Sequence, residues 1–155
     1  MLIWGCSVDS DVPHGDAGGL IPAPQVLEPR RGDFKCGGTL AVSWPEEWGA
    51  EKQVVRDWFD QAGVVLEEGQ GGLAFERSAQ VAGKEAYILE VGPEGMKVVA
   101  SSAAGLFRGW STLRKMMPVE CETGCAEGFT LSGVRIQDAP AFEHRGLLLD
   151  GCRHF

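Results

Sequence analysis

The sequence predicts an α+β fold, a two-layer sandwich in which two amphipathic helices cover one face of an antiparallel-rich sheet. One observation behind this prediction is the order of the expected elements, β–α–β–β–α–β, with a hairpin at the centre. The other is that each expected helix has a single apolar stripe, which must be buried against a neighbouring layer. With 155 residues, the chain has the size of one domain with a tail.

The first strand and the first helix are expected next to each other in the sequence. "TLAVSW" (39–44) alternates partly and contains residues that favour strands. We interpret 45–63 as a helix, because Pro45 suits a first helical turn and Gly63 suits a helix end. The apolar stripe of this helix consists of Trp48, Val55, Trp58, Phe59 and Ala62. Tryptophans can also stack on sugar rings, but the helical spacing of these two favours the core.

A hairpin and a second helix are expected to follow. "GGLAFERS" (71–78) is interpreted as a strand. In residues 85–101, apolar side chains alternate on both sides of "GPEG", which predicts two antiparallel strands joined by a tight turn. The helix is expected to begin at Ser101 or Ser102, whose hydroxyl can accept a backbone N–H, and to stop at Pro118. Its apolar face consists of Leu106, Phe107, Trp110, Leu113 and Met117.

The last part of the predicted domain is a loop followed by a strand. Residues 119–128 are acidic and contain glycine, so we expect a loop there. "FTLSGVRIQD" (129–138) is interpreted as one further strand, and the following "AP" breaks it. A new unit is then expected to begin at "AFEHRGLLLDGCRHF".

The cysteines do not indicate a complete disulfide framework, because their number, five, is odd. Cys121 and Cys125 bracket "CETGC" in the acidic loop. A loop disulfide or two free thiols is favoured there over half of a metal site, since the three histidines are scattered along the chain. We expect neither a metal nor a cofactor.

The composition argues against several classes of function. The net charge is −8 and the pI about 4.8, whereas nucleic-acid binding requires a basic face, so no nucleic-acid partner is expected. A neutral substrate such as a sugar is compatible with this charge. No apolar run approaches the roughly 20 residues of a transmembrane helix.

Residues 1–19 are interpreted as a disordered tail or the remnant of an export signal. The stretch 7–19 is rich in Asp, Gly and Ser and has little to bury. Gly5 followed by Cys6 resembles the end of a bacterial lipoprotein signal, in which the cysteine is lipidated. This context favours export to the periplasm, the cell envelope or the medium.

Three stretches resemble the N-terminal part of family-20 glycoside hydrolases, the β-N-acetylhexosaminidases. They are "LIPAPQVLEPRRGDF", "GKEAYILEVGPEGMKVVASSAAGLFRGWSTLRKMMP" and "IQDAPAFEHRGLLLDGCRHF". The resemblance implies a non-catalytic accessory domain at residues 20–138. Residues 139–155 would then begin the catalytic (β/α)8 barrel, with "GLLLD" as a truncated first strand.

The resemblance also implies roles for residues near the C-terminus. Active sites of such barrels lie at the C-terminal ends of the strands. Arg153 follows the implied strand and would bind hydroxyls of the non-reducing sugar with its planar guanidinium. Asp150 and His154 would orient this arginine or shape the pocket, and a structural hydrogen bond is an equal alternative for both.

The implied reaction is substrate-assisted, retaining removal of a terminal N-acetylhexosamine from glycans. The Asp-Glu pair that this chemistry needs does not occur in the sequence, so we expect the chain itself to be inactive. The alternatives are a carbohydrate-binding or scaffold domain that works alone, and the accessory domain of another glycosidase family. Residues 140–155 are expected to be disordered, docked non-natively or paired with a second copy, because an unpaired apolar strand promotes self-association.

Overall fold

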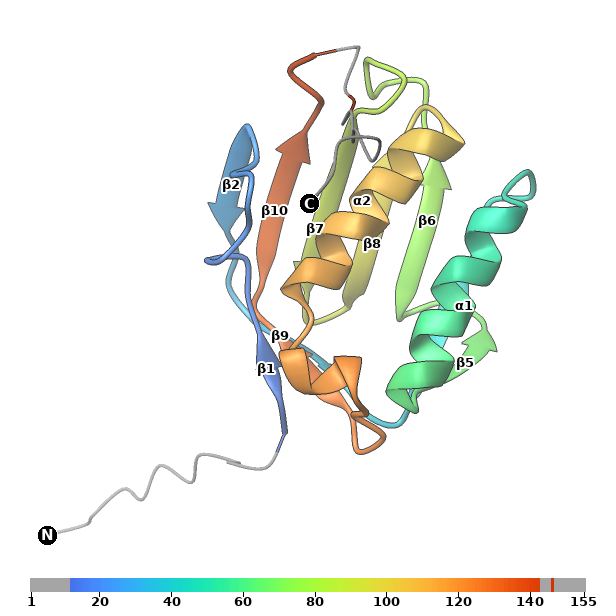
Figure 1. Ribbon diagram of the computed structural model, residues 1–155, viewed down its shortest axis with the longest axis vertical. Helices are drawn as coiled ribbons and strands as arrows, with labels where there is room; N and C mark the ends of the chain where they lie inside the picture. The colour runs from blue at the N-terminus through green and yellow to red at the C-terminus, as the bar shows by residue number, and fades with distance from the viewer. Residues whose placement is uncertain (1–11, 143–145, 147–155) are drawn as a thin grey trace, which may run out of the picture.

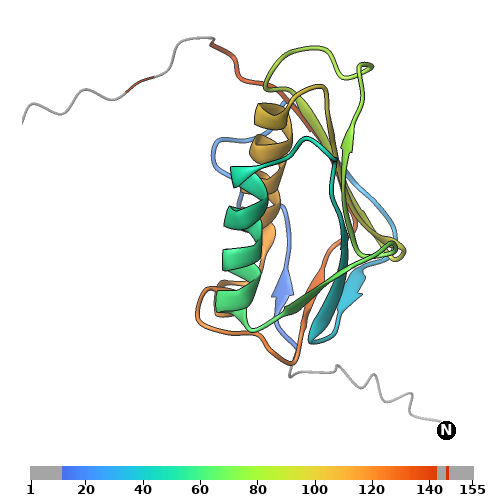
Figure 2. The ribbon, with the colours of Figure 1, turned by 90° about the vertical axis from the view of Figure 1, so that its right-hand side faces the viewer.

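The computed structural model describes residues 12–142 and 146. A seven-stranded sheet forms one layer and two helices lie on one of its faces (Figure 1, Figure 2). The helices are α1 (Ala50–Ala62) and α2 (Ala103–Met116), followed by the short 3-10 helix η1 (Val119–Glu122). The strands of the large sheet are β2 (Val26–Pro29), β4 (Thr39–Ser43), β5 (Val65–Glu68), β6 (Leu73–Arg77), β7 (Tyr87–Gly92), β8 (Gly95–Ala100) and β10 (Val134–Asp138). A smaller sheet contains β1 (His14–Gly15), β3 (Phe34–Cys36) and β9 (Phe129–Leu131).

The large sheet is mixed, in the order β2-β10-β7-β8-β6-β4-β5. Strands β2, β10, β7 and β8 pair antiparallel, whereas β8, β6, β4 and β5 pair parallel. The α+β class and the two helices against the sheet are therefore confirmed. The parallel half arises because α1 carries the chain back, so that β5 runs in the direction of β4.

The central hairpin is confirmed. Strands β7 and β8 pair from Tyr87↔Ala100 to Gly92↔Gly95. Gly95 has φ 146°, and a Cβ there would lie 2.7 Å from the carbonyl oxygen of Gly72. Glycine is thus required at this turn by its conformation and by the close approach of the neighbouring loop.

Helix α1 begins later than the sequence predicts. Pro45 lies in a turn in which its carbonyl accepts a hydrogen bond from the Trp48 backbone N–H at 3.2 Å. The helix starts at Ala50, and Gly49 precedes it without a side-chain cap. Trp48 is buried all the same, but from the turn and not from the helix. The predicted stop at Gly63 is confirmed, because this residue adopts the left-handed conformation with φ 77°.

Helix α2 agrees closely with the prediction. The Ser102 hydroxyl accepts a hydrogen bond from the Gly105 backbone N–H at 3.0 Å, so Ser102 is the cap. The helix ends at Met116, before Pro118, with Arg114 and Lys115 in its last turn. Most of the predicted apolar face is buried, and Phe107 is only partly covered.

Three aromatic residues of the two helices form one cluster. The Trp110 ring lies 5.5 Å from both Trp58 and Phe59, measured between ring centroids. All three side chains are buried, which confirms a core role for Trp58. A second cluster joins Trp44, Trp48 and Phe75 at the start of α1, with the Trp44 and Phe75 rings stacked at 5.4 Å.

The stretch 129–138 forms two strands in two different sheets, so the prediction of a single strand is wrong. The chain bends between β9 and β10 at Gly133, where a Cβ would lie 2.3 Å from the carbonyl oxygen of Gly32. After this bend the two strands belong to different sheets: β9 pairs with β1 and β3, and β10 pairs with β2 and β7. Because β1 contains His14 and Gly15, the folded part of the chain begins upstream of Leu20.

Candidate functional site

The sugar-binding residues expected from the sequence lie outside the described residues. These are Arg153, Asp150 and His154. Cys6, the lipid acceptor in the export-signal alternative for residues 1–19, also lies outside, as does most of "RGLLLDGCRHF". Their roles stay predictions, as do the domain limits 1–19, 20–138 and 139–155.

The first concave surface is a groove of about 440 Å³ where the chain leaves the domain, and we call it the exit groove. It lies between α2, the segment that precedes β2 and the segment that follows β10. Its lining residues are Leu20, Ile21, Pro22, Ala23, Pro24, Gln25, Glu85, Tyr87, Arg108, Ser111, Thr112, Lys115, Asp138, Ala139, Pro140, Ala141 and Phe142.

A buried tyrosine forms the floor of the exit groove. The Tyr87 hydroxyl lies 2.6 Å from the Thr112 hydroxyl and donates to Asp138 Oδ2 at 3.4 Å. Burial is the largest cause that raises the pKa of Tyr87, to about 12, and the Asp138 carboxylate acts in the same direction. Tyr87 is therefore protonated at neutral pH and acts as a fixed hydrogen-bonding group.

The two chain segments that flank the exit groove are held by further hydrogen bonds. The Gln25 backbone N–H donates to Asp138 Oδ1 at 3.2 Å, and the Gln25 side chain donates to the Ala139 carbonyl at 2.9 Å. Lys115 Nζ donates to the Ile21 carbonyl at 3.1 Å. These bonds connect residues more than 90 positions apart and hold residues 21–25 against α2 and the end of β10.

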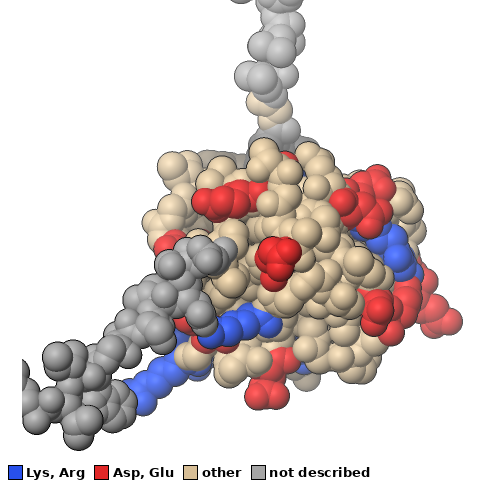
Figure 3. Space-filling model, turned by 90° about the horizontal axis from the view of Figure 1, so that it is seen from below, with Lys and Arg blue, Asp and Glu red and all other residues tan. Residues whose placement is uncertain are grey.

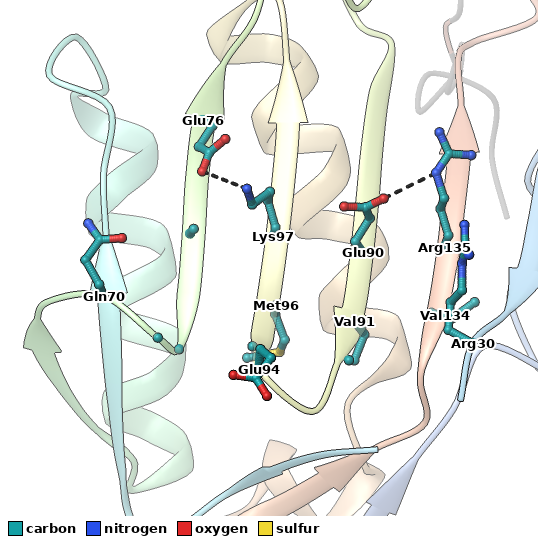
Figure 4. A pocket seen from close by; sticks show the side chains of 15 residues that line it. Arg30, Gln70, Glu76, Glu90, Val91, Glu94, Met96, Lys97, Val134 and Arg135 are labelled. Carbon is teal, nitrogen blue, oxygen red and sulfur yellow. Dashed lines mark ion pairs between the residues drawn. The ribbon is translucent and has the colours of Figure 1, made fainter. Parts of the chain in front are cut away.

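The second concave surface lies on the open face of the large sheet, and we call it the sheet-face pocket. It has a volume of about 450 Å³. Figure 4 shows its charged side chains standing on neighbouring strands, with ion pairs between Lys97 and Glu76 at 3.1 Å and between Arg135 and Glu90 at 3.3 Å. Both carboxylates are about half exposed and neutralised by their partners. This arrangement suits a solvated sheet face better than an acid–base site.

Of the two outcomes favoured for "CETGC", a disulfide or two free thiols, the structure has the disulfide. Cys121 and Cys125 are bonded to each other and buried. The loop also joins the two helices, because Glu122 accepts hydrogen bonds from Arg114 at 2.9 Å and from Trp58 at 3.4 Å. Arg114 is the main cause that lowers the pKa of Glu122.

The remaining described thiol, Cys36, is buried and free. Burial raises its pKa to about 11, so it is not a nucleophile at neutral pH. Within residues 12–142, no three His, Cys, Asp or Glu side chains are grouped as a metal site would require. Neither helix of this part of the chain has the length and hydropathy needed to cross a membrane.

The lower end of the molecule, with β1, β9 and η1, has mixed charge. On the face drawn in Figure 3, acidic and basic side chains of the described residues lie among uncharged ones.

The family of the chain follows from a comparison with known protein families. A family model described as glycosyl hydrolase family 20, domain 2, matches residues 17–139. The chain belongs to this family. The match covers α1, α2 and all strands of the large sheet, so the described fold is the accessory domain of family-20 β-hexosaminidases.

Curated relatives agree with this family. The β-hexosaminidase of Porphyromonas gingivalis is 40% identical over 74 residues, which are 46% of this chain and 10% of that protein. The β-hexosaminidase of Vibrio furnissii is 26% identical over 160 residues, which are 94% of this chain and 24% of that protein. The chain thus spans a quarter or less of the length of these two relatives.

Solved structures share the fold. The family-20 β-N-acetylhexosaminidase of Streptomyces coelicolor A3(2) has a TM-score of 0.72 and 26% identity, over 85% of this chain and 28% of that one. The exo-β-N-acetylglucosaminidase of Vibrio harveyi has a TM-score of 0.74 and 23% identity, over 96% and 23%. CpGH84D has a TM-score of 0.59 at 15% identity, so the fold alone does not select family 20.

The sequence does not reveal the exit groove. Its residues come from four stretches of the chain, 20–25, 85–87, 108–115 and 138–142, and no local pattern connects them. One signal was available: Tyr87 is the only tyrosine, it lies on a buried strand position, and a buried hydroxyl requires a partner.

Proposed function

We propose that this chain is the N-terminal part of an exo-β-N-acetylhexosaminidase, which removes terminal N-acetylhexosamine from glycans by substrate-assisted, retaining hydrolysis. The observation that carries the proposal is the family-20 match over residues 17–139. It is supported by the relatives, which are named as β-hexosaminidases. One solved relative is an exo-β-N-acetylglucosaminidase that holds N-acetylglucosamine.

The chemistry of the proposed reaction belongs to residues beyond this chain. The 2-acetamido oxygen of the substrate attacks its own anomeric carbon, an aspartate steadies the acetamide, and a glutamate protonates the leaving oxygen. The sequence contains no Asp-Glu pair. In the described part, the buried titratable side chains Tyr87 and Cys36 keep their protons at neutral pH. The chain alone is therefore proposed to be inactive.

Within this proposal, Arg153 binds hydroxyls of the non-reducing sugar. It follows "GLLLD", the proposed first barrel strand, and would lie at the catalytic end of the barrel. Its planar guanidinium can donate to two neighbouring oxygens. Asp150 and His154 are proposed to orient this side chain.

The described residues act as a scaffold for the barrel in this proposal, not as a sugar-binding module. Flat, exposed aromatic rings are needed to stack on sugars, whereas Trp48, Trp58 and Trp110 are buried and Trp44 is partly covered. Titration of the chain with N-acetylglucosamine oligomers, followed by tryptophan fluorescence, distinguishes the two roles. A saturable change would favour the binding module.

The proposed activity is tested with two proteins, the 155-residue chain and the product of the complete reading frame. Both are incubated with a chromogenic N-acetylglucosaminide. We expect turnover by the longer protein only, and a loss of at least tenfold in kcat/KM when Arg153→Ala is introduced into it. Turnover by the short chain, or a reading frame that encodes no Asp-Glu pair, would contradict the proposal.

Self-association of the short chain is tested separately. Light scattering of the 155-residue chain is compared with that of a chain ending at residue 138. A larger particle for the longer of the two is expected if the apolar segment beyond residue 139 pairs with a second copy. Equal sizes would count against such pairing.

A further inference from the structure

We propose that the open face of the large sheet, the face opposite the two helices, is a contact surface between two copies of this chain. In this contact the copies stack face to face around a twofold axis parallel to the strands, and they overlap on β2, β10, β7 and β8. The contact uses only side chains of the described residues, so it does not depend on the proposed activity.

Side chains on the open face of the sheet reach solvent. Successive residues of a strand point to opposite faces, and both helices cover the same face of the large sheet (Figure 2). Along β7, Leu89 and Val91 are therefore buried, whereas Ile88 is half-buried and Glu90 is exposed. Strands β8 and β10 alternate in the same way. In the described part of the chain, this face is thus available to a second molecule.

One row of side chains on the open face alternates in charge across four neighbouring strands. The register places Arg135 of β10 between Glu28 of β2 and Glu90 of β7. Its guanidinium lies 3.8 Å from the Glu28 carboxylate and 3.3 Å from that of Glu90. Glu90 in turn lies beside Lys97 of β8 (Figure 4). From β2 to β8 the row is therefore acidic, basic, acidic and basic.

Such a row is complementary to itself. A twofold axis that runs parallel to the strands between β10 and β7 places β2 opposite β8 of the second copy, and β10 opposite β7. Glu28 then faces Lys97 of the second copy, and Arg135 faces Glu90. A twofold axis at right angles to the strands would instead place like charges opposite each other. Charge complementarity therefore selects one orientation of the two copies.

The next row along the strands is apolar at both ends. Gln137 of β10 pairs with Val26 of β2 and with Ile88 of β7. Ile88 pairs with Val99 of β8. Val26 is 38% exposed and Val99 is half-buried. The same twofold axis places Val26 opposite Val99 of the second copy, so that the contact removes apolar surface from water.

The shape of the open face is complementary as well. Arg30 follows β2, and its side chain is 55% exposed. At the β8 end, Gly92 and Gly95 line the sheet-face pocket and have no side chains to fill it. The twofold axis places Arg30 opposite Gly95 of the second copy, next to Glu94. Glu94 is exposed and forms no ion pair with a described residue, so it can receive this arginine.

The size of the overlap makes the contact weak. Four strands span about 19 Å across the sheet, and five residues span about 17 Å along a strand. Such an area lies at the low end for specific interfaces, and the charged groups lose part of their hydration on contact. The dimer is therefore reversible, and salt weakens it because its specificity is electrostatic.

The contact is tested by sedimentation equilibrium of the 155-residue chain over a range of protein and salt concentrations. We expect a monomer–dimer equilibrium whose dissociation constant rises at least tenfold from low to high salt. Gly92→Gln should raise it at least tenfold, because the new side chain occupies the pocket. The monomer tolerates this change, since a Cβ at this position meets nothing within 4 Å. Glu67→Arg, on the edge strand β5 outside the overlap, is the control and should leave the dimer unchanged.

Two charge reversals should prevent the dimer singly and restore it together. Glu90→Arg places an arginine opposite Arg135 of the second copy, and Arg135→Glu places a glutamate opposite Glu90. Each variant should therefore be monomeric by itself. An equal mixture of the two should form a heterodimer, because every arginine at these positions then faces a glutamate. Circular dichroism of each variant establishes that it is folded.

Three results would overturn the contact. A wild-type chain that stays monomeric at every concentration is the first. A dimer that survives both single reversals is the second, because the copies would then meet elsewhere, such as at the apolar segment beyond residue 139. The third is a mixture of the two folded variants that forms no heterodimer. Hydrolysis by the complete protein is measured separately, so failure of this contact is distinguishable from failure of the proposed activity.

Discussion

Removal of the Cys121–Cys125 disulfide should lower the free energy of unfolding by about 2 kcal/mol. The bond joins residues four positions apart and therefore closes a loop of five residues. In the chain-entropy model, a loop of this length removes about 7 cal/mol/K from the unfolded state, which is about 2 kcal/mol at 25 °C. This value is low for a disulfide because the loop is short.

Contacts of the loop can add to this loss. The Cys125 backbone N–H donates to the Ala62 carbonyl at the end of α1 at 2.7 Å, and Glu122 binds Arg114 of α2. Both half-cystines are buried, so replacement by alanine introduces no polar group into the core. If the open loop frays, these contacts weaken as well, and the measured loss exceeds the entropic value.

The assay is urea unfolding of the wild-type chain and of the C121A/C125A variant, each with and without a thiol reductant. Reductant should lower the stability of the wild type to that of the variant and leave the variant unchanged. Cys36 is present in both proteins and serves as the internal control for other thiol effects. Equal midpoints for the wild type with and without reductant would refute the reasoning.

Three further predictions concern packing, pH and thiol reactivity. Gly105→Ala should lower the free energy of unfolding, measured in urea, by about 1–2 kcal/mol. The added Cβ would lie 2.5 Å from the Ala86 carbonyl oxygen. The cost of this overpacking exceeds the roughly 1 kcal/mol that alanine gains in helix propensity. Ala104→Gly, at the exposed neighbouring position, is the control and should lose about 1 kcal/mol by propensity alone. The hydrogen bond from Arg114 lowers the pKa of Glu122 in the folded chain. The wild type should therefore be more stable than Glu122→Gln above pH 4.5, the ordinary pKa of glutamate, and this difference in the free energy of unfolding should disappear as the pH falls further. Cys36 should react with maleimide at pH 7.5 only after unfolding, measured on its peptide by mass spectrometry, and rapid labelling of the native chain would contradict its burial.

The parts of the fold that the sequence predicts are those set by near neighbours in the chain. The hairpin depends on "GPEG" and on alternation of the flanking residues. The start of α2 depends on one hydroxyl, that of Ser102, and the end of α1 depends on the left-handed conformation of Gly63. Each of these determinants lies within about four residues of its effect.

The parts that the sequence does not predict depend on distant contacts. Strand β5 (Val65–Glu68) shows no clear alternation and is a strand because it pairs with β4. The separation of β9 from β10 depends on the approach of Gly133 to Gly32, about a hundred residues earlier in the chain. Helix α1 starts at Ala50 because the preceding residues form a turn that buries Trp48 in an aromatic cluster.

The candidate sites also divide into features set by local sequence and features set by distant contacts. The disulfide within "CETGC" is a local feature and was one of the two favoured outcomes. The exit groove requires Gln25, Tyr87 and Asp138 to meet, which no local pattern encodes. The sequence could therefore indicate the family through its motifs, but not the exit groove.

The buried side chains of the described residues are almost entirely apolar. Catalytic sites keep titratable side chains away from water with pKa values shifted toward the working pH. In residues 12–142, no Asp, Glu, Lys, Arg or His side chain is buried, and the pKa values of Tyr87 and Cys36 are moved away from neutrality. The core therefore contributes stability and shape without acid–base chemistry. At the exit groove, hydrogen bonds from Gln25 and Lys115 hold segments that are far apart in the chain against one another.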